Sequence, residues 1–128
     1  MDIDSVYRIY NDYRKLNEIS SLPYIVVNSD GSKLIRWFNY DIVKEDDSSA
    51  VIEITGRYEM DSGLNVREHS LNEVKELELG DFDEPELSER DYFEKLEKLY
   101  DSPDREQMKE LLRKAEVVPL LCLYEIME

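Results

Sequence analysis

The stretch YIVVNSDGSKLIRWFNYDIV, which runs from Tyr24 to Val43, decides the fold of this chain. Two runs rich in β-branched and aromatic residues flank an Asp-Gly pair, the strongest short-range signal for a β-hairpin. In the second run both alternating sets are apolar: Ile35, Trp37 and Val43 on one side, and Leu34, Phe38, Tyr40 and Ile42 on the other. Such a strand is typical of the centre of a layered sheet, or has one face in an interface.

Alternation of apolar and polar residues continues downstream of this hairpin. In AVIEITGRYEM (50–60) one set of side chains is mainly apolar and the other polar: Ile52, Ile54, Tyr58 and Met60 against Glu53, Thr55, Arg57 and Glu59. This pattern predicts a half-buried antiparallel strand, with a bulge or a close approach at Gly56. NVREHSL (65–71) predicts a fourth strand. VKELELG (74–80) predicts a fifth, although SLNE (70–73) also fits a capping box that opens a short helix.

Helical periodicity brackets the strands. Near the start, Asp4 or Ser5 can cap a helix that ends before Pro23, and its apolar residues recur at spacings of three and four: Val6, Ile9, Tyr10, Tyr13 and Leu16. After the strands, Ser88 is expected to cap one helix, and Ser102 with Pro103 a second. The apolar run 117–124 predicts a third C-terminal helix or an inner strand, and we favour the helix.

These patterns predict a single α+β domain over residues 1–128. Its expected elements are an N-terminal helix, a four- to five-stranded antiparallel β-meander, and two to three C-terminal helices packed on the sheet. The core is expected to contain the following residues: Ile9, Tyr13, Ile25, Trp37, Ile52, Ile54, Phe93, Leu96, Leu111, Leu112 and Leu121.

Charge is distributed unevenly along the chain. Residues 1–40 carry five acids and five bases, whereas residues 41–128 carry 26 acids and 11 bases, so the net charge of −15 belongs to the later part. Such a surface repels nucleic acid and anionic membranes and attracts basic proteins, although acidity also serves solubility alone. The start of the chain has no signal-peptide pattern, and one cysteine suits a reducing compartment, so we expect a cytoplasmic protein.

Acidic residues are densest in ELELGDFDEPELSERDYFE, residues 76–94, which hold nine carboxylates. Glu89 and Asp91 fall in the first turn of a predicted helix, where the helix dipole favours negative charge. Capping does not explain the acids that precede that turn: Asp81, Asp83, Glu84 and Glu86. All six are therefore predicted to bind a partner, because binding residues concentrate on loops. Glu53 and Glu59 are a second choice, since alternation places them on one sheet face.

Motifs for catalysis, cofactors or metals are not found in the sequence. An EF-hand loop counted from Asp81 has Pro85 at its fifth position and Tyr92 at its twelfth, so the calcium pattern fails. His69 and Cys122 are the single histidine and cysteine, too few ligands for a zinc site. The four glycines are isolated, which excludes a glycine-rich phosphate loop. We therefore expect a binding protein rather than an enzyme, with no catalytic residue, no cofactor and no metal.

In size, charge, aromatic content and order of elements the chain resembles the immunity proteins of bacterial polymorphic-toxin and contact-dependent growth inhibition systems. The resemblance is one of type and assigns no role to an individual residue. It implies a protein that binds and blocks a cognate toxin domain, often a nuclease with a basic cleft that carboxylates can occupy. Two other hypotheses stay open: a nucleic-acid-mimicking phage inhibitor, and a small-molecule-binding domain with a pocket lined by Trp37, Phe38 or Tyr58.

Overall fold

A computed structural model describes residues 2–14, 20–78 and 86–115, with the backbone alone at residues 77 and 78. Its elements follow one another as α1 (Ile3–Arg14), β1 (Tyr24–Val27), β2 (Lys33–Glu45), β3 (Ser49–Met60), β4 (Val66–Glu78), α2 (Glu89–Asp101) and α3 (Arg105–Ala115). The α+β class, the N-terminal helix, the antiparallel sheet and two C-terminal helices are thus confirmed. The predicted third C-terminal helix, with Leu121, lies outside the described residues.

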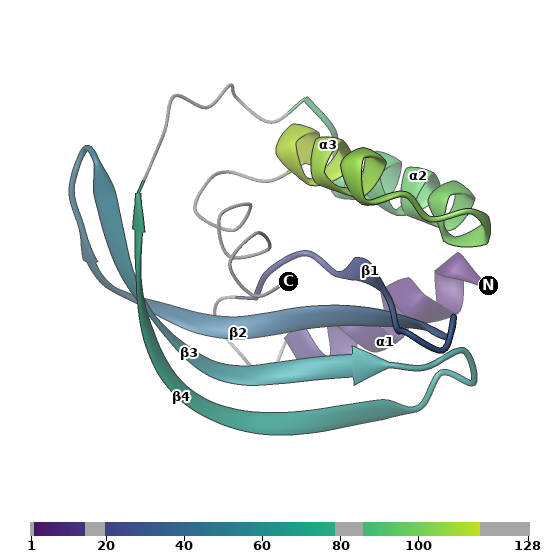
Figure 1. Ribbon diagram of the computed structural model, residues 1–128, viewed down its shortest axis with the longest axis horizontal. Helices are drawn as coiled ribbons and strands as arrows, with labels where there is room; N and C mark the ends of the chain where they lie inside the picture. Colours follow the sequence, from purple (N-terminus) through teal and green to yellow (C-terminus); the bar gives the residue numbers. More distant parts are fainter. Residues whose placement is uncertain (1, 15–19, 79–85, 116–128) are drawn as a thin grey trace.

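The sheet is an antiparallel meander in the order β1-β2-β3-β4. Its first turn follows the Asp-Gly signal, and Gly31 has φ of 85°, a conformation that favours glycine. Residues 66–78 form one continuous strand, so the predicted fourth and fifth strands are a single β4, and the alternative short helix opened by a capping box at 70–73 is wrong. Irregularities at 39/40 and 42/44 of β2 and at 54/56 of β3 accompany the curvature of the sheet in Figure 1.

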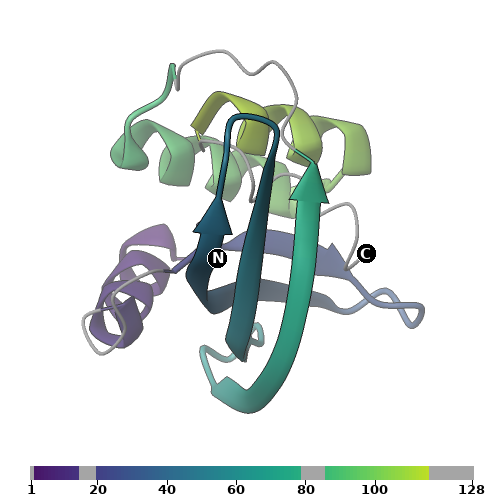
Figure 2. The same ribbon diagram turned by 90° about the vertical axis from the view of Figure 1, so that its left-hand side faces the viewer.

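Helices α2 and α3 lie side by side along the β1 side of the sheet. Helix α1 contacts α2 and lies behind the sheet in Figure 1 and beside it in Figure 2. The pair of α2 and α3 is fixed to the start of β1. The Tyr92 hydroxyl donates a hydrogen bond to the Pro23 carbonyl, and the Ile25 amide lies 3.5 Å from the Met108 sulfur. These contacts keep α2 and α3 away from the far ends of β2, β3 and β4.

Aromatic side chains fill the core between α1 and the sheet. Trp37 is fully buried, stacks on Tyr58 with ring centroids 5.6 Å apart, and meets Tyr10 edge-on at 5.5 Å. Its neighbour Phe38 points to the opposite face and is 1% exposed. The prediction that β2 is covered on both sides is therefore correct along this part of the strand.

Most of the predicted core residues are buried, with a correction in α1. Ile25, Ile52, Ile54, Phe93, Leu96, Leu111 and Leu112 are buried as expected. Ile9 and Tyr13 are only partly buried, and Val6 and Tyr10 hold the central positions instead. The apolar stripe of α1 is wide enough for either pair, so the orientation in which the helix packs decides between them.

Two of the three predicted helix caps are wrong. Asp2, rather than Asp4 or Ser5, caps α1, because its carboxylate accepts from the Asp4 amide at 3.2 Å. Ser88 does cap α2, and its hydroxyl accepts from the Asp91 amide at 3.2 Å. At α3 the Asp104 carboxylate accepts from the Gln107 amide at 3.0 Å, whereas Ser102 terminates α2. Where several residues that can cap a helix stand close together in the sequence, tertiary packing decides which of them becomes the cap.

We expect Asp104→Ala to lower the free energy of unfolding by about 1 kcal/mol, the usual loss for an N-cap. Ser102→Ala is the matched control, and we expect a change of about 0.5 kcal/mol or less, as for a surface position. Urea unfolding with an unchanged m value measures both changes. A larger loss from Ser102→Ala than from Asp104→Ala would contradict the assignment of the cap.

No helix among the described residues has the length and apolar composition needed to cross a membrane.

Candidate functional site

The acidic loop that the sequence singles out is only partly described. Asp81, Asp83 and Glu84 lie outside the described residues. Glu86 is exposed, and its backbone amide donates to the Lys114 carbonyl at 2.7 Å. Asp91 is also exposed, in the first turn of α2, where its amide is used by the Ser88 cap. Glu86 and Asp91 form no ion pair with a described residue, so both carboxylates remain available to a partner.

Glu89 has an internal role. Its carboxylate forms an ion pair with Arg14 at the end of α1, and the Tyr7 hydroxyl donates to it at 3.4 Å. The hydrogen bond from Arg14 to Glu89 raises the pKa of Arg14 more than partial burial lowers it. Glu89 therefore joins α2 to α1, and its charge is already compensated within the fold.

Glu59 is likewise neutralised within the protein. Its side chain is 13% exposed, and its carboxylate lies 2.9 Å from Arg36, 3.2 Å from His69 and 3.5 Å from Arg57. Partial burial by itself raises the pKa of Glu59. The hydrogen bond from Arg36 and the surrounding positive charges outweigh that effect, and the net pKa is lowered. Of Glu53 and Glu59, the two acids predicted as second-choice binding residues, Glu59 is therefore enclosed by cations and Glu53 is not.

Glu53 belongs to a different surface, at the far ends of three strands. We call this region the distal sheet: residues 41–45 of β2, the turn 46–48, residues 49–53 of β3 and residues 74–76 of β4. Figure 2 looks onto it, and no described helix covers it in that view. Ala50 and Ile52 are buried on its inner side, whereas all of residues 41–48 are exposed. The opposite, outer face of the distal sheet is thus open to solvent.

Cross-strand register defines the outer face of the distal sheet. Asp41, Glu53 and Val74 are partners in one row, and Lys44, Val51 and Glu76 in another. Directly paired side chains share a face, so three carboxylates lie among two valines and one lysine. None of these three carboxylates forms an ion pair with a described residue. In the adjoining turn, hydrogen bonds from the Ser48 and Ser49 amides lower the pKa of Asp46, so that this exposed acid stays charged.

Apolar side chains are exposed on the same part of the sheet. Val74 is 62% exposed in the row of Glu53, and Val43 is 61% exposed at the β2 irregularity. Ile42 is 43% exposed but pairs with Ile52 on the inner side. Carboxylates beside aliphatic groups provide both parts of a typical protein interface, charge for encounter and apolar area for affinity. The sequence signal for this surface is the apolar pair Ile42–Val43, whose side chains fall on alternate faces of the strand, followed by EDD at 45–47.

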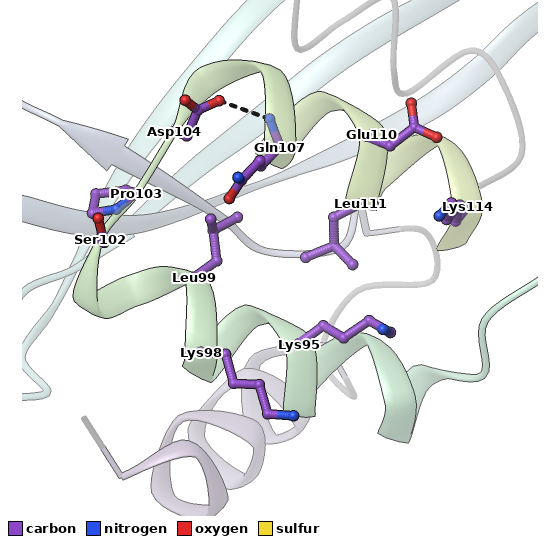
Figure 3. Close-up of a pocket in the computed structure, with 10 residues that line it drawn as sticks. All are labelled: Lys95, Lys98, Leu99, Ser102, Pro103, Asp104, Gln107, Glu110, Leu111 and Lys114. Atoms are coloured by element: carbon purple, nitrogen blue, oxygen red, sulfur yellow. Dashed lines mark hydrogen bonds between the residues drawn. The ribbon is translucent and has the colours of Figure 1, made fainter.

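An open groove of about 700 Å³ lies between α2 and α3 (Figure 3). Leu99 and Leu111 point into the space between the two helices, and Lys95 and Lys98 extend from the α2 side. The rim mixes three lysines with Asp104 and Glu110. A second groove of about 320 Å³ lies between α1 and α2, beside Tyr7 and Phe93. Trp37, Phe38 and Tyr58 line neither groove, so the aromatic pocket of the small-molecule hypothesis is not found in these two.

Among the described residues no group of three or more histidine, cysteine, aspartate or glutamate side chains is placed to hold a metal ion. His69 lies on β4 against Glu59, and Cys122 lies outside the described residues.

Comparison with known proteins found no matching family model, no matching curated protein and no matching solved structure.

Proposed function

We propose that this protein is a non-enzymatic inhibitor of the immunity type, which binds a cognate basic toxin domain, with a nuclease as the expected class. The observation that carries the proposal is the outer face of the distal sheet. There Asp41, Glu53 and Glu76 have no described basic partner and lie beside exposed aliphatic side chains. A nuclease that holds phosphates offers a basic cleft, which a rigid set of carboxylates complements.

The outer face of the distal sheet is favoured as the contact surface over Glu59 and Glu89, because both of those acids are already paired within the fold. Glu59 and Glu89 face arginines of their own chain, so a partner gains little from them. The acids of the distal sheet are held on strands, whose geometry is less variable than that of a loop. Glu86, Asp91 and the acids at 81–84 remain a second proposed contact. A cytoplasmic location and a cytoplasmic target are part of the same proposal.

Neutralising the outer face is the direct test. We expect Asp41→Asn combined with Glu53→Gln and Glu76→Gln to slow association with the toxin domain about tenfold or more at low salt, because opposite charges speed the encounter by 10- to 1000-fold. The salt dependence of the association rate should become flatter in the same variant. Stopped-flow or surface-plasmon-resonance kinetics with the product of the adjacent gene measures both effects.

A matched control removes the same charge elsewhere. Asp12→Asn, Asp101→Asn and Glu110→Gln lie on the three helices, and their side chains are exposed. This control should associate at close to the wild-type rate and should protect cells that express the toxin domain. A third variant, with amides at Asp81, Asp83, Glu84 and Glu86, tests the loop separately. Equal association rates for the distal-sheet variant and the helix control would refute this surface, and failure of the wild type to protect cells would refute the function.

A further inference from the structure

One face of the sheet carries a cluster of basic side chains in this acidic protein. Arg36, Glu59 and Arg67 form one cross-strand row, and Phe38, Arg57 and His69 form the next. Residues two apart on a strand share a face, so three guanidinium groups, one imidazole and one carboxylate gather there. We call Arg57, Arg67 and His69 the arginine patch, with Glu59 and Arg36 beside it.

The single carboxylate does not balance this cluster. Three arginines against Glu59 leave a net charge of +2 when His69 is neutral and +3 when it is protonated. Asp61 also attracts Arg67, but the Asp61 carboxylate is held by the amides of Gly63 and Asn65 in the adjoining turn. A positive charge therefore persists at the surface, where Arg57 is 31% and His69 40% exposed.

Arg57 has an unsatisfied donor at the centre of the patch. Its Nε lies 3.5 Å from a Glu59 oxygen, and it is buried without a hydrogen-bond partner in the part of the chain that the structure describes. Buried donors normally have a partner. The Arg57 and His69 side chains keep 31% and 40% exposure, so an oxyanion bound over them would meet Arg57 through its exposed part rather than through the buried Nε.

We propose that the arginine patch binds the phosphate group of a small molecule, with Arg57, Arg67 and His69 as its donors. A phosphate offers several strong acceptors and two negative charges, which match several donors and a net charge of at least +2. Glu59 and Arg36 are positioning residues that hold Arg57 and His69 in place. The overall charge of −15 repels long polyanions, so a small phosphate compound is favoured over nucleic acid. This site is independent of the proposed inhibitor function.

His69 provides a clean probe because it is the single histidine of the chain. Imidazole NMR signals of the full-length protein are followed during titration with inorganic phosphate, pyrophosphate, acetate and chloride at fixed pH and fixed ionic strength. We expect saturable shifts with phosphate and tighter binding of pyrophosphate, with weaker shifts for acetate and none for chloride. Arg57→Gln and Arg67→Gln should each weaken phosphate binding at least tenfold. Arg90→Gln, on the exposed side of α2, should leave it unchanged.

Each alternative outcome is decisive. Equal shifts with chloride and phosphate would mean that the signals report screening alone, and the site would be rejected. Stronger binding of acetate than of phosphate would overturn the ligand class. If Arg57→Gln does not fold, Arg67→Gln decides, because Arg67 is exposed on the outermost strand. Affinities of Arg67→Gln and Arg90→Gln that equal the wild type would overturn the proposal.

Discussion

Trp37→Ala is expected to lower the free energy of unfolding by about 3–5 kcal/mol, the range for truncating a large aromatic residue in a core. The side chain is fully buried and lies between Tyr58, at an interplanar angle of 8°, and the edges of Tyr10 and Tyr13. Its removal leaves a cavity at the point where α1 meets the sheet. Since small domains are stable by only about 5–15 kcal/mol, the variant should be partly unfolded at moderate temperature.

Trp37→Phe is the control for this prediction. The indole N–H is buried and has no hydrogen-bond partner among the described residues, so its removal offsets part of the lost packing. We expect a loss of about 1–2 kcal/mol for this change, since buried area falls but a ring remains. Urea unfolding followed by circular dichroism measures both variants. Equal losses for alanine and phenylalanine would contradict this account, because they would mean that a phenyl ring at this position restores none of the lost packing.

Glu59→Gln is expected to lower the free energy of unfolding by about 2–3 kcal/mol at neutral pH. This is below the 3–5 kcal/mol for breaking a fully buried ion pair, because the Glu59 side chain keeps 13% exposure. Glutamine preserves the shape, but it leaves Arg36, Arg57 and any charge on His69 without their counter-charge. Glu76→Gln is the matched control on the same sheet, and its exposed side chain should change stability by about 0.5 kcal/mol or less.

The effect of Glu59→Gln should depend on pH in a defined direction. Because the folded pKa of Glu59 is lowered, its ionised form stabilises the protein above the unfolded pKa of about 4.3. That contribution is lost as the pH falls from the unfolded pKa through the lower folded value. The stability difference between wild type and Glu59→Gln should therefore be full at neutral pH and shrink below about pH 4. A difference that stays constant on acidification would show that Glu59 acts through its shape alone.

Local sequence by itself determined the class and order of the elements. The Asp-Gly turn, the change of period near Pro23, the Ser88 cap and the bulge at Gly56 are all short-range features, and each has the predicted structure. They were readable because turn geometry, capping and alternation depend on residues only a few positions apart. The same reasoning did not choose between Ser102 and Asp104, or between Ile9 and Val6, because neighbouring residues there offer equivalent local solutions.

Tertiary structure alone decided which acids carry uncompensated charge. Glu89 meets Arg14 across 75 residues of sequence, and Glu59 meets Arg36 across 23. Strand register brings Arg57, Arg67 and His69 together, and it separates Glu53 from Glu59 despite their shared alternation. Electrostatic neutralisation acts over a few ångströms in space, and sequence spacing contains no measure of that distance. Composition therefore predicted an acidic protein, and the register of the folded sheet determined where its charge is available.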